Sequence, residues 1–152
     1  MDTAVSEAPR TLEYLTVQDM LWVNLQLTKK SNPCDYALLE EATYYQYGYG
    51  GSLDLIGQAA QFLTGFAKKQ PFYGQADAAT ALIGCVAFLA LNGQTLDLPA
   101  GEVKSWLERI TGGQIDASQA IGQLVKPSHD HHPAPAACLK AAIAKYGAAL
   151  MG

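Results

Sequence analysis

Apolar residues recur at helical spacing along most of the chain, and no stretch of useful length alternates as a strand would. This pattern predicts an all-α fold. The expected helices cover approximately residues 16–31, 35–42, 54–69, 77–91, 103–111, 116–125 and 138–150, with 52 as an alternative start for the third. The stretch from Ala78 to Leu91 carries no charge, which predicts a helix buried on all sides.

Residues that favour helix ends support several of these boundaries. Thr16 and Asp19 have approximately the spacing of a capping box, in which two side chains satisfy the first backbone N–H groups of a helix. Asp35 and Asp116 are suitable N-caps, and Asn92-Gly93 is a suitable C-terminal stop.

The same pattern divides the chain into three parts. Residues 1–13 are polar and aperiodic, so we expect a flexible N-terminal tail. Residues 14–126 form a single helical domain, and residues 127–152 form a proline-rich linker followed by a C-terminal helical appendage. The last helix is rich in alanine and packs either on the domain or on a second copy of the chain, so a homo-oligomer is one of two expected arrangements.

Composition and charge exclude several classes of protein. Apolar residues make up 49% of the chain and charged residues 16%, which is typical of a folded protein. The net charge is −4 and basic residues occur at most in pairs, which argues against nucleic acid as a partner. The uncharged run is shorter than the roughly 20 residues that cross a bilayer, and the N-terminus lacks the pattern of a signal peptide. We therefore expect no membrane partner.

The three cysteines, Cys34, Cys85 and Cys138, are widely spaced and form no CxxC motif. This spacing suggests neither a zinc knuckle nor a disulfide framework. Reduced thiols, and hence a cytoplasmic protein, are the simplest interpretation.

Two stretches carry a resemblance to a known family. YLTVQDMLWVNLQL (14–27) is similar to the opening helix of Fic/Doc proteins, and QPFYGQADAATALIGCVAFLALNG (70–93) resembles their central motif with the helix that follows. That motif reads His-Pro-Phe, one variable residue, Asp-Gly-Asn-Lys-Arg-Thr-Ala, then an apolar helix ending Phe-Leu-x-x-Asn-Gly. Pro71-Phe72, Thr80-Ala81 and the segment 88–93 match it, with one extra residue near Tyr73.

The middle of the motif departs from the family. In the family the histidine is the general base, the acidic residue helps to hold a metal with the nucleotide phosphates, and the glycine, asparagine and basic residues form an anion cradle. The corresponding positions here are, in order, Gln70, Gln75, Ala76, Asp77, Ala78 and Ala79.

These changes remove the chemistry that the resemblance would imply. Gln70 has no nitrogen that titrates near neutral pH, and neutral Gln75 is a poor ligand for magnesium. Ala78 and Ala79 offer no positive charge. We further expect Asp77 to occupy the N-terminus of its helix with its own carboxylate and so to repel a phosphate. No cofactor is expected.

A loop rich in tyrosine and glycine, residues 44–52, is the candidate binding surface. Its tyrosines are Tyr44, Tyr45, Tyr47 and Tyr49. Tyrosine combines a large apolar area with a polar tip, which suits protein recognition. The matching region of the family holds a flap that aligns target peptides. The alternative is that Tyr44 and Tyr45 simply pack at the end of the second helix.

All three histidines lie in one short segment: His129, His131 and His132. Imidazole is a good ligand for zinc or nickel. Adjacent residues point in different directions, however, and prolines flank the segment. We therefore predict a solvated linker without a specific metal.

We predict a catalytically inactive Fic/Doc-like protein that binds or regulates a partner protein. The resemblance implies a bacterial, cytoplasmic setting, and several family members belong to toxin–antitoxin systems. The alternative is an enzyme of altered nucleotidyl- or phosphotransferase chemistry that uses Gln70, Tyr73, Gln75 and Asp77. An open cleft with convergent polar groups favours the enzyme, whereas a cleft plugged by Tyr73 or closed by the last helix favours the binding protein.

Overall fold

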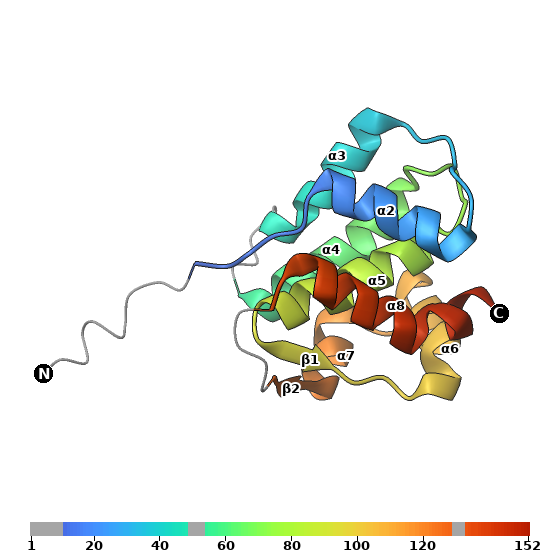
Figure 1. The fold of residues 1–152 in the computed structure, drawn as a ribbon. Coiled ribbons are helices and arrows are strands. Elements are labelled where there is room, and N and C mark those ends of the chain that lie inside the picture. Colours follow the sequence, from blue (N-terminus) through green and yellow to red (C-terminus); the bar gives the residue numbers. More distant parts are fainter. Residues whose placement is uncertain (1–10, 49–53, 129–132) are drawn as a thin grey trace, which may run out of the picture.

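Helices dominate the computed structural model of the chain, which describes residues 11–48, 54–128 and 133–152 (Figure 1). The α-helices of the described residues are α2 (Val17–Thr28), α3 (Tyr36–Tyr44), α4 (Leu55–Lys69), α5 (Asp77–Leu91), α6 (Val103–Thr111), α7 (Ala117–Leu124) and α8 (Pro135–Met151). Two short 3-10 helices join them, η1 (Tyr45–Tyr47) and η2 (Ala100–Glu102). The prediction of an all-α fold is confirmed. Most of the predicted tail, residues 1–10, lies outside the described residues.

Local side-chain bonds explain where the helices begin. The Thr16 hydroxyl accepts the Asp19 N–H at 3.1 Å, and the Asp19 carboxylate accepts the Thr16 N–H at 2.8 Å, so the predicted capping box is present. Asp35 and Asp116 cap α3 and α7 as expected. Asp54 caps α4, which therefore begins at the later of the two expected starts. α2 ends earlier than predicted, because the next residue, Lys29, adopts a left-handed conformation with φ of 63°.

A two-stranded sheet departs from the expectation of helices alone. β1 (Gln94–Leu96) pairs antiparallel with β2 (Val125–Pro127), and Thr95 lies opposite Lys126. Each strand has three residues, too few for an alternating pattern to be recognised in the sequence. The sixth predicted helix is shorter than expected, because Val125 is extended and belongs to β2.

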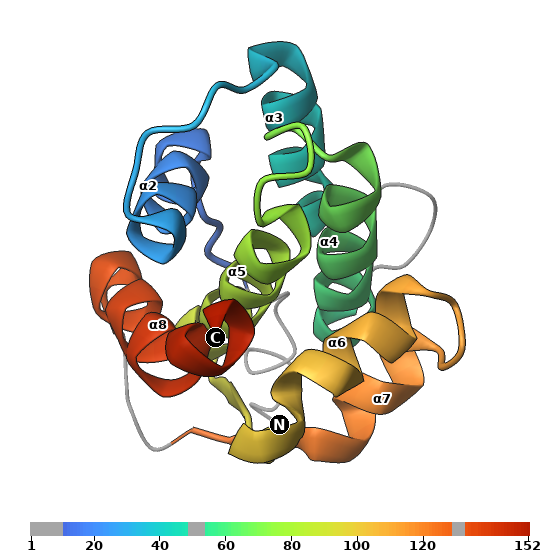
Figure 2. The same cartoon turned by 90° about the vertical axis from the view of Figure 1, so that its right-hand side faces the viewer.

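The helix α5 lies at the centre of the fold, with the other helices arranged around it (Figure 2). It packs most extensively against α4 and α8, and also contacts α2 and α6. Every residue of α5 is buried except Ala78 and Ala90, which confirms the prediction drawn from its lack of charge. Among the described residues, no helix has the length and apolar character needed to cross a membrane.

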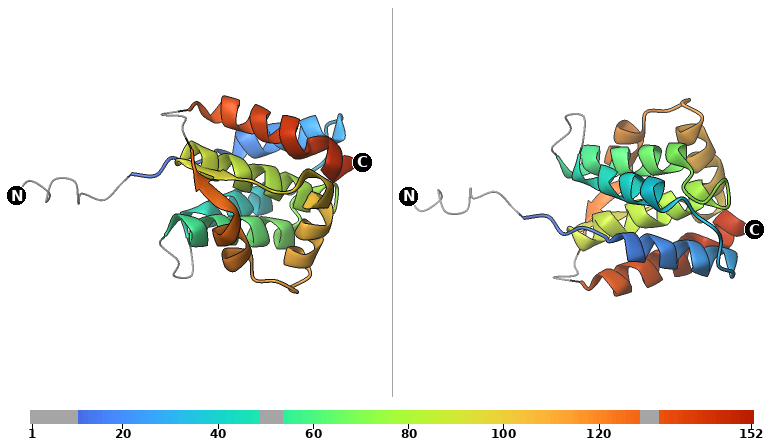
Figure 3. Two further views of the ribbon diagram at one scale, coloured as in Figure 1. Left: turned by 90° about the horizontal axis from the view of Figure 1, so that it is seen from below. Right: turned by 90° about the horizontal axis from the view of Figure 1, so that it is seen from above.

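The last helix belongs to the same core. α8 packs along α5 and beside α2, and both views of Figure 3 show it next to α2. Tyr146 of α8 is fully buried, and its hydroxyl donates to the Leu96 carbonyl at 3.0 Å and accepts the Leu98 N–H at 2.8 Å. Of the two arrangements expected for this helix, the structure therefore shows packing on the domain.

Candidate functional site

The segment 70–76, which carries the altered motif, connects α4 to α5 through an unusual backbone. Three residues that are not glycine have positive φ: Gln70 at 49°, Tyr73 at 55° and Ala76 at 60°. Gly74 follows the same pattern at 91°. A non-glycine residue in this region costs on the order of 1–3 kcal/mol and persists only where neighbouring contacts hold it. The contacts that hold this loop therefore define the site.

Asp77, in the first turn of α5, supplies the first of these contacts. One carboxylate oxygen accepts the Phe72 N–H at 2.9 Å and the other accepts the Gly74 N–H at 2.7 Å. The side chain is only 4% exposed. Burial raises the pKa of the Asp77 carboxyl above its usual range, although the two backbone bonds act in the opposite direction.

The role predicted for Asp77 requires a correction. We expected its carboxylate to occupy the N-terminus of its own helix, but no side chain caps α5. The N-cap, Ala76, adopts the left-handed conformation, and the loop before it folds back so that its N–H groups reach the carboxylate. Asp77 therefore stabilises the loop and leaves the first N–H groups of α5 without a side-chain cap.

Asn24 of α2 supplies a second contact, which sequence reasoning missed. This buried amide donates to the Gln75 carbonyl at 2.8 Å and to the Thr80 hydroxyl at 3.0 Å. Its own oxygen accepts from Asn32 at 2.8 Å. The sequence offered little signal for this role, because Gln18 and Gln26 are also amide side chains among the apolar residues of the first helix. These bonds fasten the loop and the first turn of α5 to α2.

A cleft of about 790 Å³ opens beside the loop. The end of α4, the loop, the first turn of α5 and the end of α6 form its walls. The polar residues and glycines of the lining are Thr64, Lys68, Gln70, Gly74, Asp77, Thr111, Gly112 and Gly113.

The cleft is neither plugged nor covered in the ways that would favour the binding protein. Tyr73 is 63% exposed, and neither Tyr73 nor any residue of α8 lines the cleft. An open cleft with several polar groups is the arrangement expected of the enzyme alternative. Its chemistry must therefore be judged from the groups present.

The motif residues divide into those that line the cleft and those that do not. Gln70 is exposed at its edge, and the lining includes Ala76, Asp77, Ala78 and Ala79. The other three loop residues of the motif are not part of the lining: Pro71 and Phe72 are buried, and Gln75 is exposed.

Two titratable side chains line the cleft within the described residues: Lys68 and Asp77. Both oxygens of Asp77 already accept backbone N–H groups. Lys68 is exposed at the end of α4. Lys68 was not among the site residues predicted from the sequence, because its place in the cleft depends on how α4 packs against α5 and α6. The lining thus offers one cation and no carboxylate or imidazole available to accept a proton.

A cluster of three tyrosines forms a second candidate surface at the junction of α3 and η1. We call Tyr14, Tyr44 and Tyr47 the aromatic surface. The rings of Tyr14 and Tyr47 stack with centroids 4.1 Å apart, and Tyr44 meets Tyr47 edge-on at 5.9 Å. Tyr44 is 38% exposed and Tyr47 is 42% exposed. Tyr49 lies outside the described residues.

The residues next to the aromatic surface hold it in place. Buried Gln46 accepts the Leu15 N–H and donates to the Leu15 carbonyl, both at 2.8 Å, which fixes the segment around Tyr14 against η1. Tyr45 was also a candidate binding residue, but its ring packs over Gly65 of α4. Tyr45 therefore contributes to packing, as the alternative interpretation of the loop proposed.

The predicted linker contains all three histidines of the chain. His129, His131 and His132 all lie outside the described residues. Within the described part of the chain, no group of three histidine, cysteine, aspartate or glutamate side chains is arranged to hold a metal ion. Comparison with known proteins gives no match: no family model, no curated protein and no solved structure is similar to the chain.

Proposed function

We propose that the chain is a catalytically inactive helical module of the Fic/Doc type that binds a partner protein in the bacterial cytoplasm. A regulatory role of the kind found in toxin–antitoxin systems is part of this proposal. The observation that carries it is the aromatic surface, where Tyr44 and Tyr47 are exposed while their rings are held by aromatic contacts.

The chemistry of the cleft supports the loss of nucleotide transfer. General base catalysis requires a group within hydrogen-bond reach of the reacting proton and with a pKa near the working pH. Gln70 stands at the position of the family's base and has no such group. Asp77 is committed to the N–H groups of Phe72 and Gly74, and its carboxylate is buried.

The aromatic surface supports protein binding on energetic grounds. Ordering an exposed side chain on binding costs about 0.5–1.5 kcal/mol, and side chains that are already held avoid part of that cost. Tyr47 stacks on Tyr14, which is fixed next to Leu15 and Gln46, so its ring is ordered before a partner arrives. Tyrosine is also enriched among the residues that contribute most to binding interfaces.

A second candidate function rests on the open cleft. Lys68 and the uncapped first turn of α5 line the same space, and both favour a negatively charged group there. This observation supports an enzyme of altered nucleotidyl- or phosphotransferase chemistry. Such an enzyme would need its substrate or a partner to supply the missing base.

The proposal is tested by quantitative capture from a lysate of the source organism. Tyr44 and Tyr47 are replaced together by alanine, and the matched control is Tyr36→Ala, which removes a tyrosine that is 48% exposed at the other end of α3. We expect a protein that the wild type and the control retain equally. The double variant should bind that protein at least about tenfold more weakly, because loss of contacts of this kind typically costs 1 kcal/mol or more each. Equal retention by all three proteins would contradict the proposal.

A further inference from the structure

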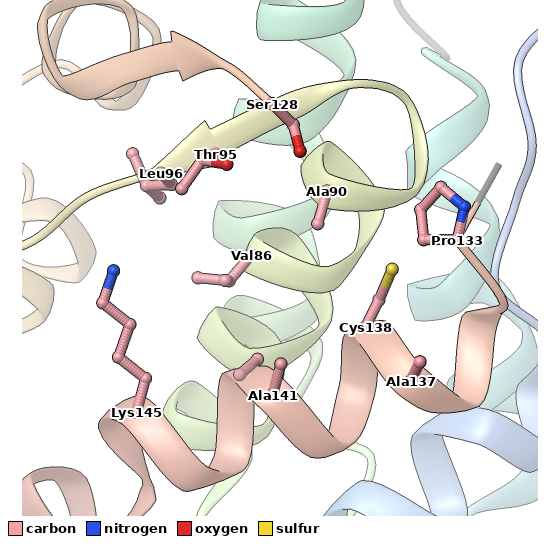
Figure 4. A pocket seen from close by; sticks show the side chains of 11 residues that line it. Val86, Ala90, Thr95, Leu96, Ser128, Pro133, Ala137, Cys138, Ala141 and Lys145 are labelled. Carbon is pink, nitrogen blue, oxygen red and sulfur yellow. The ribbon is translucent and has the colours of Figure 1, made fainter. Parts of the chain in front are cut away.

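A second cavity lies at the other end of α5, between this helix, α8 and β1 (Figure 4). Its volume is about 220 Å³. Val86 and Ala90 contribute to it from α5, whereas the cleft described above begins at Asp77. The nearest α5 residues of the two linings, Ala79 and Val86, are seven positions apart, or about 10 Å of helix at 1.5 Å per residue, and the two linings share no residue, so the sites are separate.

Small apolar groups form most of the wall of this cavity. The face of α8 contributes Ala137, Cys138, Ala141 and Ala142, and Leu96 of β1 contributes from the other side. Because these side chains are short, α5 and α8 leave space between them that their packing does not fill. An apolar cavity of about 150 Å³ is large enough to bind benzene in an engineered protein, so this one has room for a larger apolar body.

One end of the cavity carries a positive charge. Figure 4 shows Cys138 and Lys145 rising from the same face of α8 at opposite ends of the pocket. The Lys145 ammonium lies 3.2 Å from one oxygen of Asp97, and the Lys126 ammonium lies 3.6 Å from the other. Among the described residues, these two cations therefore share the single carboxylate of Asp97, which leaves one positive charge there without a paired carboxylate.

Lys145 also retains the capacity to bind another anion. An ammonium group has three N–H donors; Asp97 accepts one hydrogen bond from Lys145 at 3.2 Å, and the centroid of the Tyr146 ring lies 5.2 Å from the same ammonium. The side chain of Lys145 is 46% exposed, so a ligand in the pocket can reach the ammonium without unfolding its surroundings.

We propose that this pocket binds a small organic monocarboxylate, with an apolar body of about six to ten carbon atoms between α5 and α8 and its carboxylate on Lys145. Apart from the hydroxyls of Thr95 and Ser128, the wall beside the body is mostly apolar, so a ligand with polar groups along most of its body would lose hydrogen bonds to water without replacing them. The charge at Lys145 distinguishes an acid from an uncharged molecule of the same length. The site is independent of the aromatic surface and of the cleft.

The test uses octanoate as the probe and the full chain in isothermal titration calorimetry. We expect saturable binding at one site, with 1-octanol binding roughly tenfold more weakly, since a charge-assisted hydrogen bond contributes about 1.5 kcal/mol. Lys145→Gln should weaken the binding of octanoate by about the same factor and remove the preference of the pocket for octanoate over 1-octanol. Lys140→Gln is the matched control, because Lys140 is exposed on α8 but does not line the pocket.

A second pair of variants locates the apolar body. Ala141→Leu places extra methyl groups in the pocket from an exposed position and should abolish octanoate binding, whereas Ala144→Leu, exposed on α8 outside the lining, should leave it unchanged. Absence of saturable octanoate binding to the wild type would overturn the proposal. So would binding that Ala141→Leu leaves intact, or octanoate binding that Lys145→Gln does not weaken.

Discussion

Replacing Asp77 tests how the loop before α5 is held. Asp77→Ala removes the oxygens that accept the Phe72 and Gly74 N–H groups at 2.9 and 2.7 Å. Because Phe72 is buried, its N–H group then loses its hydrogen-bond partner in the interior. A hydrogen bond to a charged group contributes about 1.5–3 kcal/mol, and an unsatisfied buried donor costs about 1–3 kcal/mol.

Part of this loss is offset, because the variant no longer has to bury a carboxylate. The raised pKa of Asp77 shows that this burial is unfavourable for the ionised form. We therefore expect Asp77→Ala to lower the free energy of unfolding by about 2–4 kcal/mol at pH 7. Asp77→Asn keeps one acceptor but turns an amide donor toward the other N–H group, so its loss should be smaller, about 1–2 kcal/mol.

The dependence on pH provides a second readout of the same residue. A carboxyl whose pKa is raised in the folded state contributes stability that is fully present below its unfolded pKa and lost as pH rises through the folded pKa. The difference in stability between wild type and Asp77→Asn should therefore grow as pH falls from 7 toward 4. Urea unfolding followed by circular dichroism at several pH values measures both effects. An Asp77→Ala protein within about 0.5 kcal/mol of wild type would refute the assignment.

Three further predictions concern the rest of the fold. Tyr146→Phe removes the hydroxyl shared by Leu96 and Leu98 and should cost about 1–3 kcal/mol in urea unfolding, whereas exposed Tyr36→Phe should change stability by less than about 0.5 kcal/mol. Gly65→Ala places a Cβ 2.6 Å from the Tyr45 ring and should destabilise the protein by about 1–3 kcal/mol. In the same unfolding assay Gly122→Ala should be neutral or stabilising, because a Cβ there would lie 4.0 Å from the Ile56 side chain. The hydrogen bond from Lys145, followed by the charges of Lys145 and Lys126, lowers the pKa of Asp97. The stabilisation that Asp97 gives is therefore present above its unfolded pKa and is lost as pH falls through its folded pKa. In an acid titration, the difference in stability between the wild type and Asp97→Asn should shrink below about pH 4.

The helices could be predicted because their signals are local. Thr16, Asp35 and Asp116 cap helices that begin next to them, and these bonds involve residues only three positions apart. The burial of α5 followed from its composition, since none of its residues after Asp77 is charged and an apolar helix surface is expected to be buried. These features depend little on the rest of the chain.

The parts of the site that escaped prediction depend on contacts between distant segments. Asn24 meets Gln75 across 51 positions of sequence, and Lys68 enters the cleft only because the end of α6 packs nearby. The hydrogen bonds of Asp77 also depend on the backbone of the preceding loop, where Gln70, Tyr73 and Ala76 are left-handed although they are not glycine and so gave no sequence signal. The sheet of β1 and β2 escaped because each strand is three residues long.

The proposal that the cleft beside α5 does not support nucleotide transfer is tested most directly by titrating the full chain with ATP and magnesium in a calorimeter. We predict no saturable binding below about 100 µM, because Gln70 and Gln75 supply neither a base nor a metal ligand and Lys68 is the cation that the described lining offers. Lys68→Ala is the companion variant, since it removes that cation from an exposed position. Saturable binding tighter than this limit, weakened by Lys68→Ala, would contradict the inactive module and favour the altered enzyme.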